Sequence, residues 1–68
     1  MEPIDIVLKC VFGASAPRLR RYFTIVYRDN GLAVVRHVQD PILYVVVGNR
    51  VYIIEYGIGR VSSRLVYA

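Results

Sequence analysis

The apolar residues of this chain fall into short runs separated by turn residues, and the clearest pair of runs lies in the second half. Residues 42–47 and 51–56 are almost entirely apolar, and Gly48-Asn49 stands between them. Gly48 can adopt a positive φ at no steric cost, which suits the first position of a type II′ turn. The pattern therefore predicts a β-hairpin over residues 42–56.

A two-residue loop fixes which side chains of this hairpin share a face. One face then carries Leu43, Val45, Tyr52 and Ile54, and the other carries Tyr44, Val46, Val51 and Ile53. Side chains alternate between the faces of a strand, so a strand with one solvated face normally alternates apolar and polar residues. Neither face of this hairpin is polar. Both faces therefore require cover, from the rest of the chain or from another chain.

Alternating apolar positions predict further strands around the hairpin. Residues 4–12 alternate well, with one face made of Ile4, Ile6, Leu8, Cys10 and Phe12. Residues 18–28 and 32–38 flank Asn30-Gly31, which is a strong short-range signal for a second hairpin. Residues 61–67 contain two serines and an arginine, and this polar content suits a strand at the edge of a sheet.

The register of the second hairpin stays open. If Asn30-Gly31 is the whole loop, both residues take positive φ in a type I′ turn and Ile25 lies opposite Arg36. A three-residue turn with a glycine bulge would shift the second strand by one position, so that His37 turns inward and Arg36 moves to the opposite face. The first register buries an arginine, which counts against it.

The pattern as a whole predicts a single small all-β domain over residues 1–68. Turn residues separate the apolar runs at intervals of about 8–12 residues, which is typical of small β proteins. We expect a meander of five or six short antiparallel strands that forms a compact barrel or sandwich, with little or no helix.

The short length of the chain makes its stability marginal. A chain of 68 residues buries only about 60% of the surface that its unfolded form exposes. One Cys permits no intrachain disulfide, and one Cys with one His gives no basis for a metal site or a cofactor. Hydrophobic residues nevertheless make up 56% of the chain. We therefore expect a homo-oligomer, most simply a dimer.

The charge distribution gives the leading hypothesis for function, which is nucleic-acid binding. The net charge is +4, and several arginines surround Tyr22 in the predicted strand 18–28. Guanidinium groups pair with phosphate, and an aromatic ring can stack on a base. We expect a small basic β-barrel that contacts the phosphates of DNA or RNA through an Arg-rich sheet face. The expected nucleic-acid-binding residues are Arg18, Arg20, Tyr22, Arg28 and His37.

Two other interpretations of these features are possible. Arginines can also solvate an exposed sheet face by laying their apolar stems over it, with no ligand involved. The apolar hairpin 42–56 favours a non-enzymatic structural or protein-interaction module, either a homo-oligomer or a small subunit of an assembly. The expected interface residues in that case are Leu43, Val45, Tyr52 and Ile54.

Catalysis is not expected, and we name no catalytic residue. Cys10 lies in an apolar row without an activating neighbour, and nothing pairs His37 with a nucleophile. The longest uncharged apolar run, residues 41–49, is far shorter than the roughly 20 residues of a membrane-spanning helix, so no membrane contact is expected. A single unpaired Cys favours a cytoplasmic location. Few side-chain amides and many Arg residues favour a thermophilic source.

Overall fold

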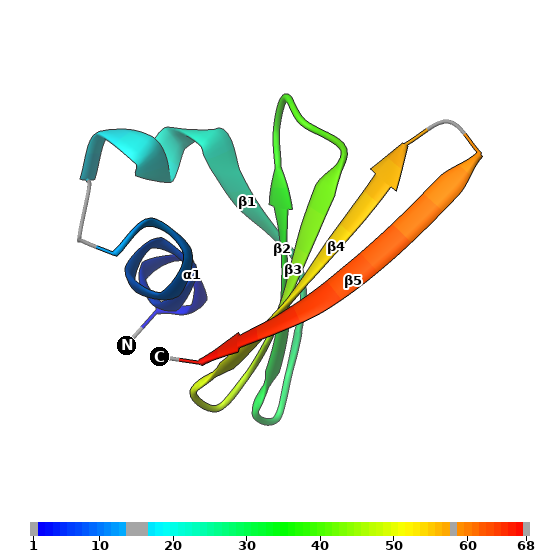
Figure 1. The fold of residues 1–68 in the computed structure, drawn as a ribbon. Coiled ribbons are helices and arrows are strands. Elements are labelled where there is room, and N and C mark those ends of the chain that lie inside the picture. The colour runs from blue at the N-terminus through cyan, green and yellow to red at the C-terminus, as the bar shows by residue number, and fades with distance from the viewer. Residues whose placement is uncertain (1, 14–16, 58, 68) are drawn as a thin grey trace.

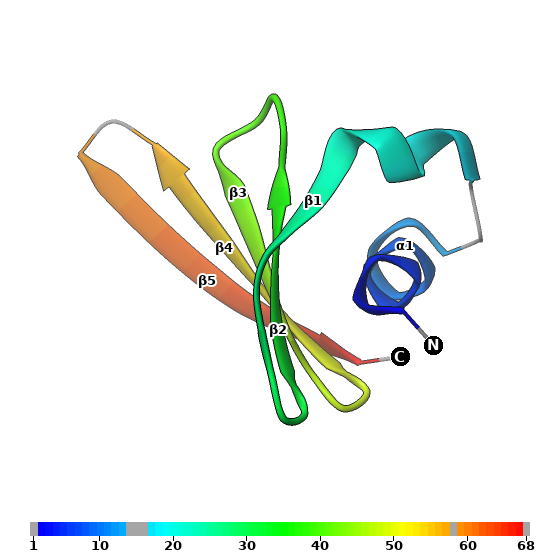
Figure 2. The same ribbon diagram turned by 180° about the vertical axis from the view of Figure 1, so that it is seen from behind.

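One antiparallel sheet and one α-helix form the body of the protein. The computed structural model describes residues 2–13, 17–57 and 59–67. Helix α1 (Pro3–Phe12) and the 3₁₀ helix η1 (Pro17–Tyr22) precede the strands β1 (Phe23–Asp29), β2 (Leu32–His37), β3 (Ile42–Val47), β4 (Arg50–Gly57) and β5 (Arg60–Tyr67). Each strand pairs with its neighbour in the sequence, so the sheet order is β1-β2-β3-β4-β5 (Figure 1). Helix α1 lies on one side of this sheet in both views (Figures 1 and 2).

The predicted antiparallel meander is confirmed, with five strands. The sheet is not closed into a barrel, because β1 and β5 each pair with one strand only among the described residues. The expectation of little or no helix is wrong for the first part of the chain, where α1 and η1 replace predicted strands. The fold is therefore an open sheet with helical cover on one face.

Residues 4–12 form most of helix α1 rather than the predicted strand. The alternation of apolar residues is present, but so is the i, i+3, i+4, i+7 spacing of a helix face, at Ile4, Val7, Leu8 and Val11. In the structure, the residues with the helical spacing face the sheet together. Val7 and Leu8 are adjacent in the sequence and both are buried, with exposures of 0% and 1%. Both side chains pack on the sheet because a helix can direct neighbouring residues toward one face.

The ends of α1 have recognisable helix signals. Pro3 occupies the first turn, where a missing N–H costs nothing because that group has no partner within the helix. Gly13 ends the helix in the left-handed region with φ +75°, and its N–H donates to the carbonyl of Lys9 at 3.2 Å. Asp5 in the first turn and Lys9 in the last turn complement the helix dipole.

The predicted strand over residues 18–28 is shorter than expected, because β1 begins only at Phe23. The preceding residues form η1, and the fixed φ of Pro17 is compatible with that helical start. The carbonyl of Tyr22, the last residue of η1, accepts a hydrogen bond from the N–H of Val38 at 2.8 Å. This bond ties the end of η1 to the segment that follows β2.

The β3–β4 hairpin matches the prediction residue by residue. Val47 pairs with Arg50 across a two-residue turn, and the predicted pairs continue from there to Ile42 with Glu55. Gly48 has φ +59°, whereas Asn49 does not have positive φ, as a type II′ turn requires. The central hairpin is thus specified by its own sequence.

The β1–β2 hairpin combines features of both predicted registers. Its loop has two residues, yet Asn30 keeps a negative φ and only Gly31 is positive, so the predicted type I′ turn is wrong. The register then shifts at Val26, which forms a β-bulge. Because of this shift, Arg36 pairs with Thr24 instead of Ile25, and His37 pairs with Phe23 on the helix side of the sheet.

The hydrophobic core lies between α1 and one face of the sheet. Helix α1 contacts all five strands, so a single helix covers the middle of that face. The nine buried core residues are Val7, Leu8, Phe23, Ala33, Val35, Tyr44, Val46, Val51 and Ile53. The face of the hairpin predicted to carry Tyr44 and Ile53 has therefore received its cover from within the chain.

The helix assignment is tested by truncating adjacent residues. We expect Leu8→Ala to lower the free energy of unfolding by about 2–5 kcal/mol, as for other buried leucines. We expect Val7→Ala to lower it by about 1–2 kcal/mol, because two buried carbon groups are lost. Lys9→Ala on the exposed side of α1 should change it by less than about 0.5 kcal/mol. Urea unfolding measures all three. A neutral Val7→Ala would contradict the helix, since a strand would direct Val7 away from Leu8.

Candidate functional site

The face of the sheet opposite α1 is largely apolar, with Arg36 and Arg50 in its flanking rows, and has no cover among the described residues. Its central row crosses all five strands, since the cross-strand pairs place Tyr27, Val34, Val45, Tyr52 and Leu65 in line. Leu32 and Val47 flank the row on one side, and Leu43 and Ile54 flank it on the other. We call these nine residues the open face. None of them is buried, and Tyr27 is 50% exposed.

All four predicted interface residues lie on the open face. Val45 pairs with Tyr52, and Leu43 pairs with Ile54, so they form one contiguous block on β3 and β4. Sequence reasoning missed the members of the open face on β1, β2 and β5. The signal that could have found them is the register, which aligns their apolar positions with Val45 once each hairpin is paired correctly.

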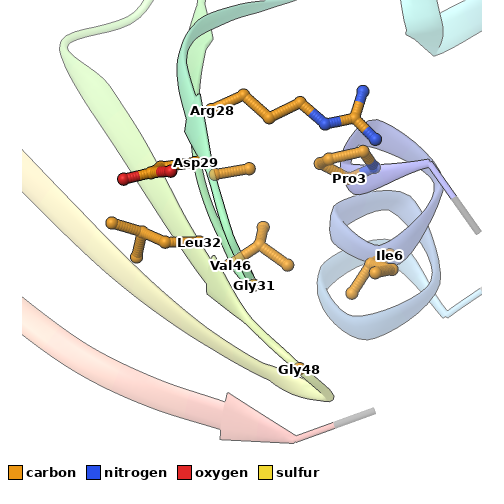
Figure 3. Close-up of a pocket in the computed structure, with 9 residues that line it drawn as sticks. Pro3, Ile6, Arg28, Asp29, Gly31, Leu32, Val46 and Gly48 are labelled. Carbon is orange, nitrogen blue, oxygen red and sulfur yellow. The ribbon is translucent and has the colours of Figure 1, made fainter.

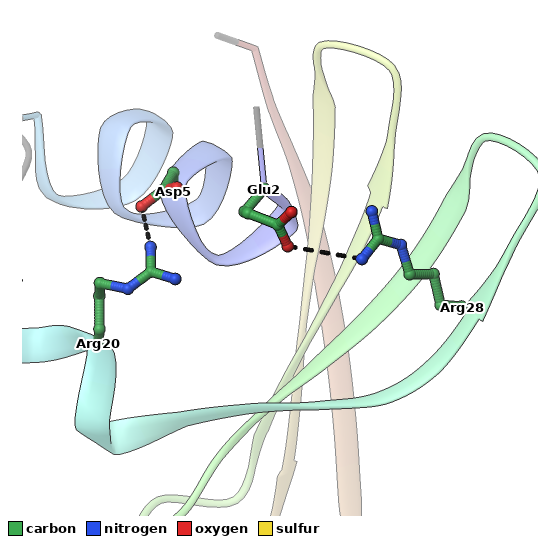
Figure 4. A network of polar contacts seen from close by, with 4 residues as sticks. All are labelled: Glu2, Asp5, Arg20 and Arg28. Carbon is green, nitrogen blue, oxygen red and sulfur yellow. Dashed lines mark hydrogen bonds and ion pairs between the residues drawn. The ribbon is translucent and has the colours of Figure 1, made fainter.

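The five predicted nucleic-acid-binding residues are divided by the fold instead of sharing one sheet face. Arg18 and Arg20 lie on η1, and Arg28 lies on β1. Arg20 forms an ion pair with Asp5, and the Nη1 atom of Arg28 lies 3.5 Å from the Oε2 atom of Glu2 (Figure 4). Both carboxylates come from the N-terminal segment that holds α1. They reduce the positive charge that Arg20 and Arg28 can present to a ligand.

The structure does bring Tyr22 and His37 together. Their rings are nearly parallel, with an interplanar angle of 5° and centroids 6.1 Å apart. The guanidinium carbon of Arg21 lies over the Tyr22 ring, 5.2 Å from its centroid, and Arg21 Nη2 donates to the Tyr22 hydroxyl at 3.2 Å. Arg18 joins Arg21 and Tyr22 in lining an adjacent hollow of about 430 Å³. We call Arg18, Arg21, Tyr22 and His37 the cation–aromatic cluster.

His37 has a structural role in this cluster. Its Nδ1 atom accepts hydrogen bonds from the backbone N–H groups of Gln39 and Asp40, at 3.1 Å and 2.9 Å. The neutral ring therefore carries its proton on Nε2. The edge of Phe23 packs against the same ring, with centroids 5.2 Å apart and planes at 87°. These contacts hold the His37 ring in place beneath Tyr22.

A second, smaller hollow has few polar groups that are free to bind a ligand. It has a volume of about 210 Å³ and lies between the start of α1 and the turns of the two hairpins (Figure 3). Pro3, Ile6, Ala33 and Val46 give it mostly apolar walls. Arg28 reaches it, but the guanidinium of that residue is already paired with Glu2.

Cys10 is the one cysteine of the chain, and its thiol is not activated by its surroundings. Burial raises the pKa of the Cys10 thiol, and nearby Lys9 lowers it only in part, so the thiolate is disfavoured at neutral pH. In residues 2–13, 17–57 and 59–67, His, Cys, Asp and Glu side chains form no group of three that could hold a metal ion. None of the helices described is long and apolar enough to cross a membrane.

Comparisons with protein-family models, with curated proteins and with solved structures gave no match for this chain. Two features of the protein's own surface bear on its function. One is the open face, and the other is the cation–aromatic cluster.

The structural role of His37 predicts a loss of stability when its acceptor is removed. His37→Phe keeps an aromatic ring beside Tyr22 but leaves the amides of Gln39 and Asp40 without their partner. We expect the free energy of unfolding to fall by about 1–2 kcal/mol. His37→Asn should retain part of the turn, because an Asn oxygen can accept backbone N–H bonds at a turn. Urea unfolding of both variants checks the assignment, and an undiminished stability of His37→Phe would contradict it.

Tyr44 gives the fold a dependence on alkaline pH. Burial raises the pKa of its phenol, the carboxylates of Asp40 and Glu55 raise it further, and Arg64 lowers it in part. The unfolded phenol titrates near pH ~10. The stabilisation due to the neutral phenol is therefore complete below about pH 10 and falls as the pH rises above that value.

The corresponding measurement is the free energy of unfolding at about pH 9 and about pH 11. We expect the alkaline loss to be smaller in Tyr44→Phe than in the unsubstituted protein. Tyr56→Phe, at a position outside the open face, serves as the control and should retain the full loss. Equal losses in all three proteins would show that Tyr44 is not the responsible group.

Proposed function

We propose that this protein is a non-enzymatic interaction module that forms a homodimer through its open face. One observation carries the proposal, namely that an apolar row crosses all five strands on the face that α1 leaves uncovered. Monomeric soluble proteins rarely expose an apolar surface of this extent. In the proposed dimer the two sheets pack face to face and form a β-sandwich between two chains, about 10 Å apart.

The dimensions of the open face are sufficient for such a dimer. Five strands spaced about 4.8 Å apart, with about six residues each at about 3.3 Å, give a footprint of roughly 500 Å² per chain. Two chains would bury roughly 1,000 Å², which is about the lower limit for a stable biological interface. Side chains that stand out from the sheet add to this area.

The open face also matches a rotated copy of itself. A two-fold axis parallel to β3 places Val45 opposite the same residue of the second copy, and it places Tyr52 opposite Val34. Leu65 at one edge would then meet Tyr27 at the other. Asp29 on β1 and Arg50 on β4 lie in one row at the rim, so the rotation brings charges of opposite sign toward each other. This symmetry favours a second copy over an unrelated partner.

A charge in the middle of the open face tests the proposal. We expect the unsubstituted protein to have twice its monomer mass in light scattering and to dissociate on dilution. Val45→Glu and Tyr52→Glu should each have the monomer mass, because a carboxylate would be buried without a partner in the dimer. Circular dichroism confirms that each variant keeps its sheet.

The control places the same substitution on the opposite face of the sheet. Ser62 pairs with Glu55 on the helix side and is exposed. Ser62→Glu should therefore leave the dimer intact. A protein that stays monomeric at millimolar concentration would overturn the proposal, and so would Val45→Glu and Tyr52→Glu variants that remain folded dimers.

A further inference from the structure

The arginines of η1 and β1 differ in whether an acidic side chain already pairs with them. Arg20 pairs with Asp5, and Arg28 pairs with Glu2. Arg18 and Arg21 form no ion pair with any acidic side chain of the described residues. Both lie beside the 430 Å³ hollow. Their charges are therefore available to an external anion.

These two cations adjoin an aromatic platform that the fold has already ordered. The Tyr22 carbonyl is bonded to the N–H of Val38, and the His37 ring is held by two backbone amides. The Tyr22 ring lies parallel to the His37 ring, and the Arg21 guanidinium lies over Tyr22. Groups that are ordered before binding lose little conformational entropy when a ligand arrives.

We infer that the cation–aromatic cluster binds single-stranded nucleic acid. An unstacked base can lie on the plane of a guanidinium group, and Arg21, supported from below by the Tyr22 ring, supplies such a plane. A guanidinium also forms paired hydrogen bonds with phosphate, which Arg18 would supply beside the hollow. A duplex keeps its bases stacked within the helix, so this combination selects a single strand. The site is separate from the open face and does not depend on dimerisation.

The experiment uses fluorescence polarisation with a labelled oligothymidylate and a labelled oligouridylate. We expect both to bind, because stacking and phosphate contacts do not require a particular base. Two phosphate contacts predict a slope of about −1.4 when the logarithm of affinity is plotted against the logarithm of salt concentration. Arg18→Ala and Arg21→Ala should each weaken binding about tenfold. Tyr22→Ala should weaken it similarly, and Tyr22→Phe should restore most of it.

Arg28→Ala is the matched control, because it removes the same charge from an arginine that is already ion-paired. It should weaken binding less than twofold. Equal losses for Arg28→Ala and Arg21→Ala would show that net charge alone attracts the strand, and would overturn the site. Equal affinity for a duplex of the same length would overturn the stacking role, as would equal competition by inorganic polyphosphate. No binding at low salt would overturn the whole inference.

Two variants distinguish a failure of nucleic-acid binding from a failure of the proposed dimer. Val45→Glu lies on the opposite face of the sheet, so it should abolish the dimer and leave binding per chain within about twofold. Arg21→Ala should weaken nucleic-acid binding and leave the dimer intact. A Val45→Glu monomer that no longer binds would contradict the independence of the two surfaces.

Discussion

Packing of α1 on the sheet is the interaction on which the rest of the structure depends. The central hairpin is apolar on both faces, and the described chain has one helix with which to cover it. Val7 and Leu8 make that cover possible, since each is essentially inaccessible to solvent against the sheet. A second helix of similar size would be needed for the other face. The described residues thus place α1 on one face of the sheet and leave the other face without a helix.

The β-bulge at Val26 determines how the two surfaces are separated. Without it, Phe23 and Ile25 would share a face with Tyr27, which belongs to the open face, and neither side chain would reach the core. The extra residue turns Phe23 to the helix side, where it meets His37, the ring that stacks with Tyr22. Bulges of this kind commonly redirect a side chain near a functional position. One inserted residue therefore brings the Phe23 ring into the core and completes the aromatic platform.

How much the sequence can predict differs between the parts of this protein. The β3–β4 hairpin was predictable because its turn and its β-branched runs agree, and local signals are sufficient there. Helix α1 was not, because Ile4 to Phe12 satisfies a period of two as well as a period of 3.6. Only contact with the sheet decides between the two periods. The shared face of Leu43, Val45, Tyr52 and Ile54 was predictable from hairpin pairing alone, whereas the rest of the open face required the register of all five strands.

The arginines show a different limit of sequence reasoning. The number of arginines suggested one basic sheet face. In the structure, however, Arg20 pairs with Asp5 and Arg28 pairs with Glu2, and both carboxylates lie at the start of α1. Such pairs join residues 15 and 26 positions apart, so spacing along the chain does not reveal them. The cluster of Arg21 with Tyr22 and His37 likewise depends on the β-bulge at Val26, and no local sequence motif predicts that bulge.

The order of the elements along the chain has a consequence for how the fold assembles in time. The strands pair only with sequence neighbours, and such local pairing favours rapid folding. Helix α1 is different, because it precedes all five strands along the chain but contacts every one of them. During synthesis the apolar side of α1 remains unpacked until nearly the whole sheet has been made. The growing chain therefore exposes Val7 and Leu8 for longer than any other part of its core, and this interval is when it is most open to aggregation or to chaperones.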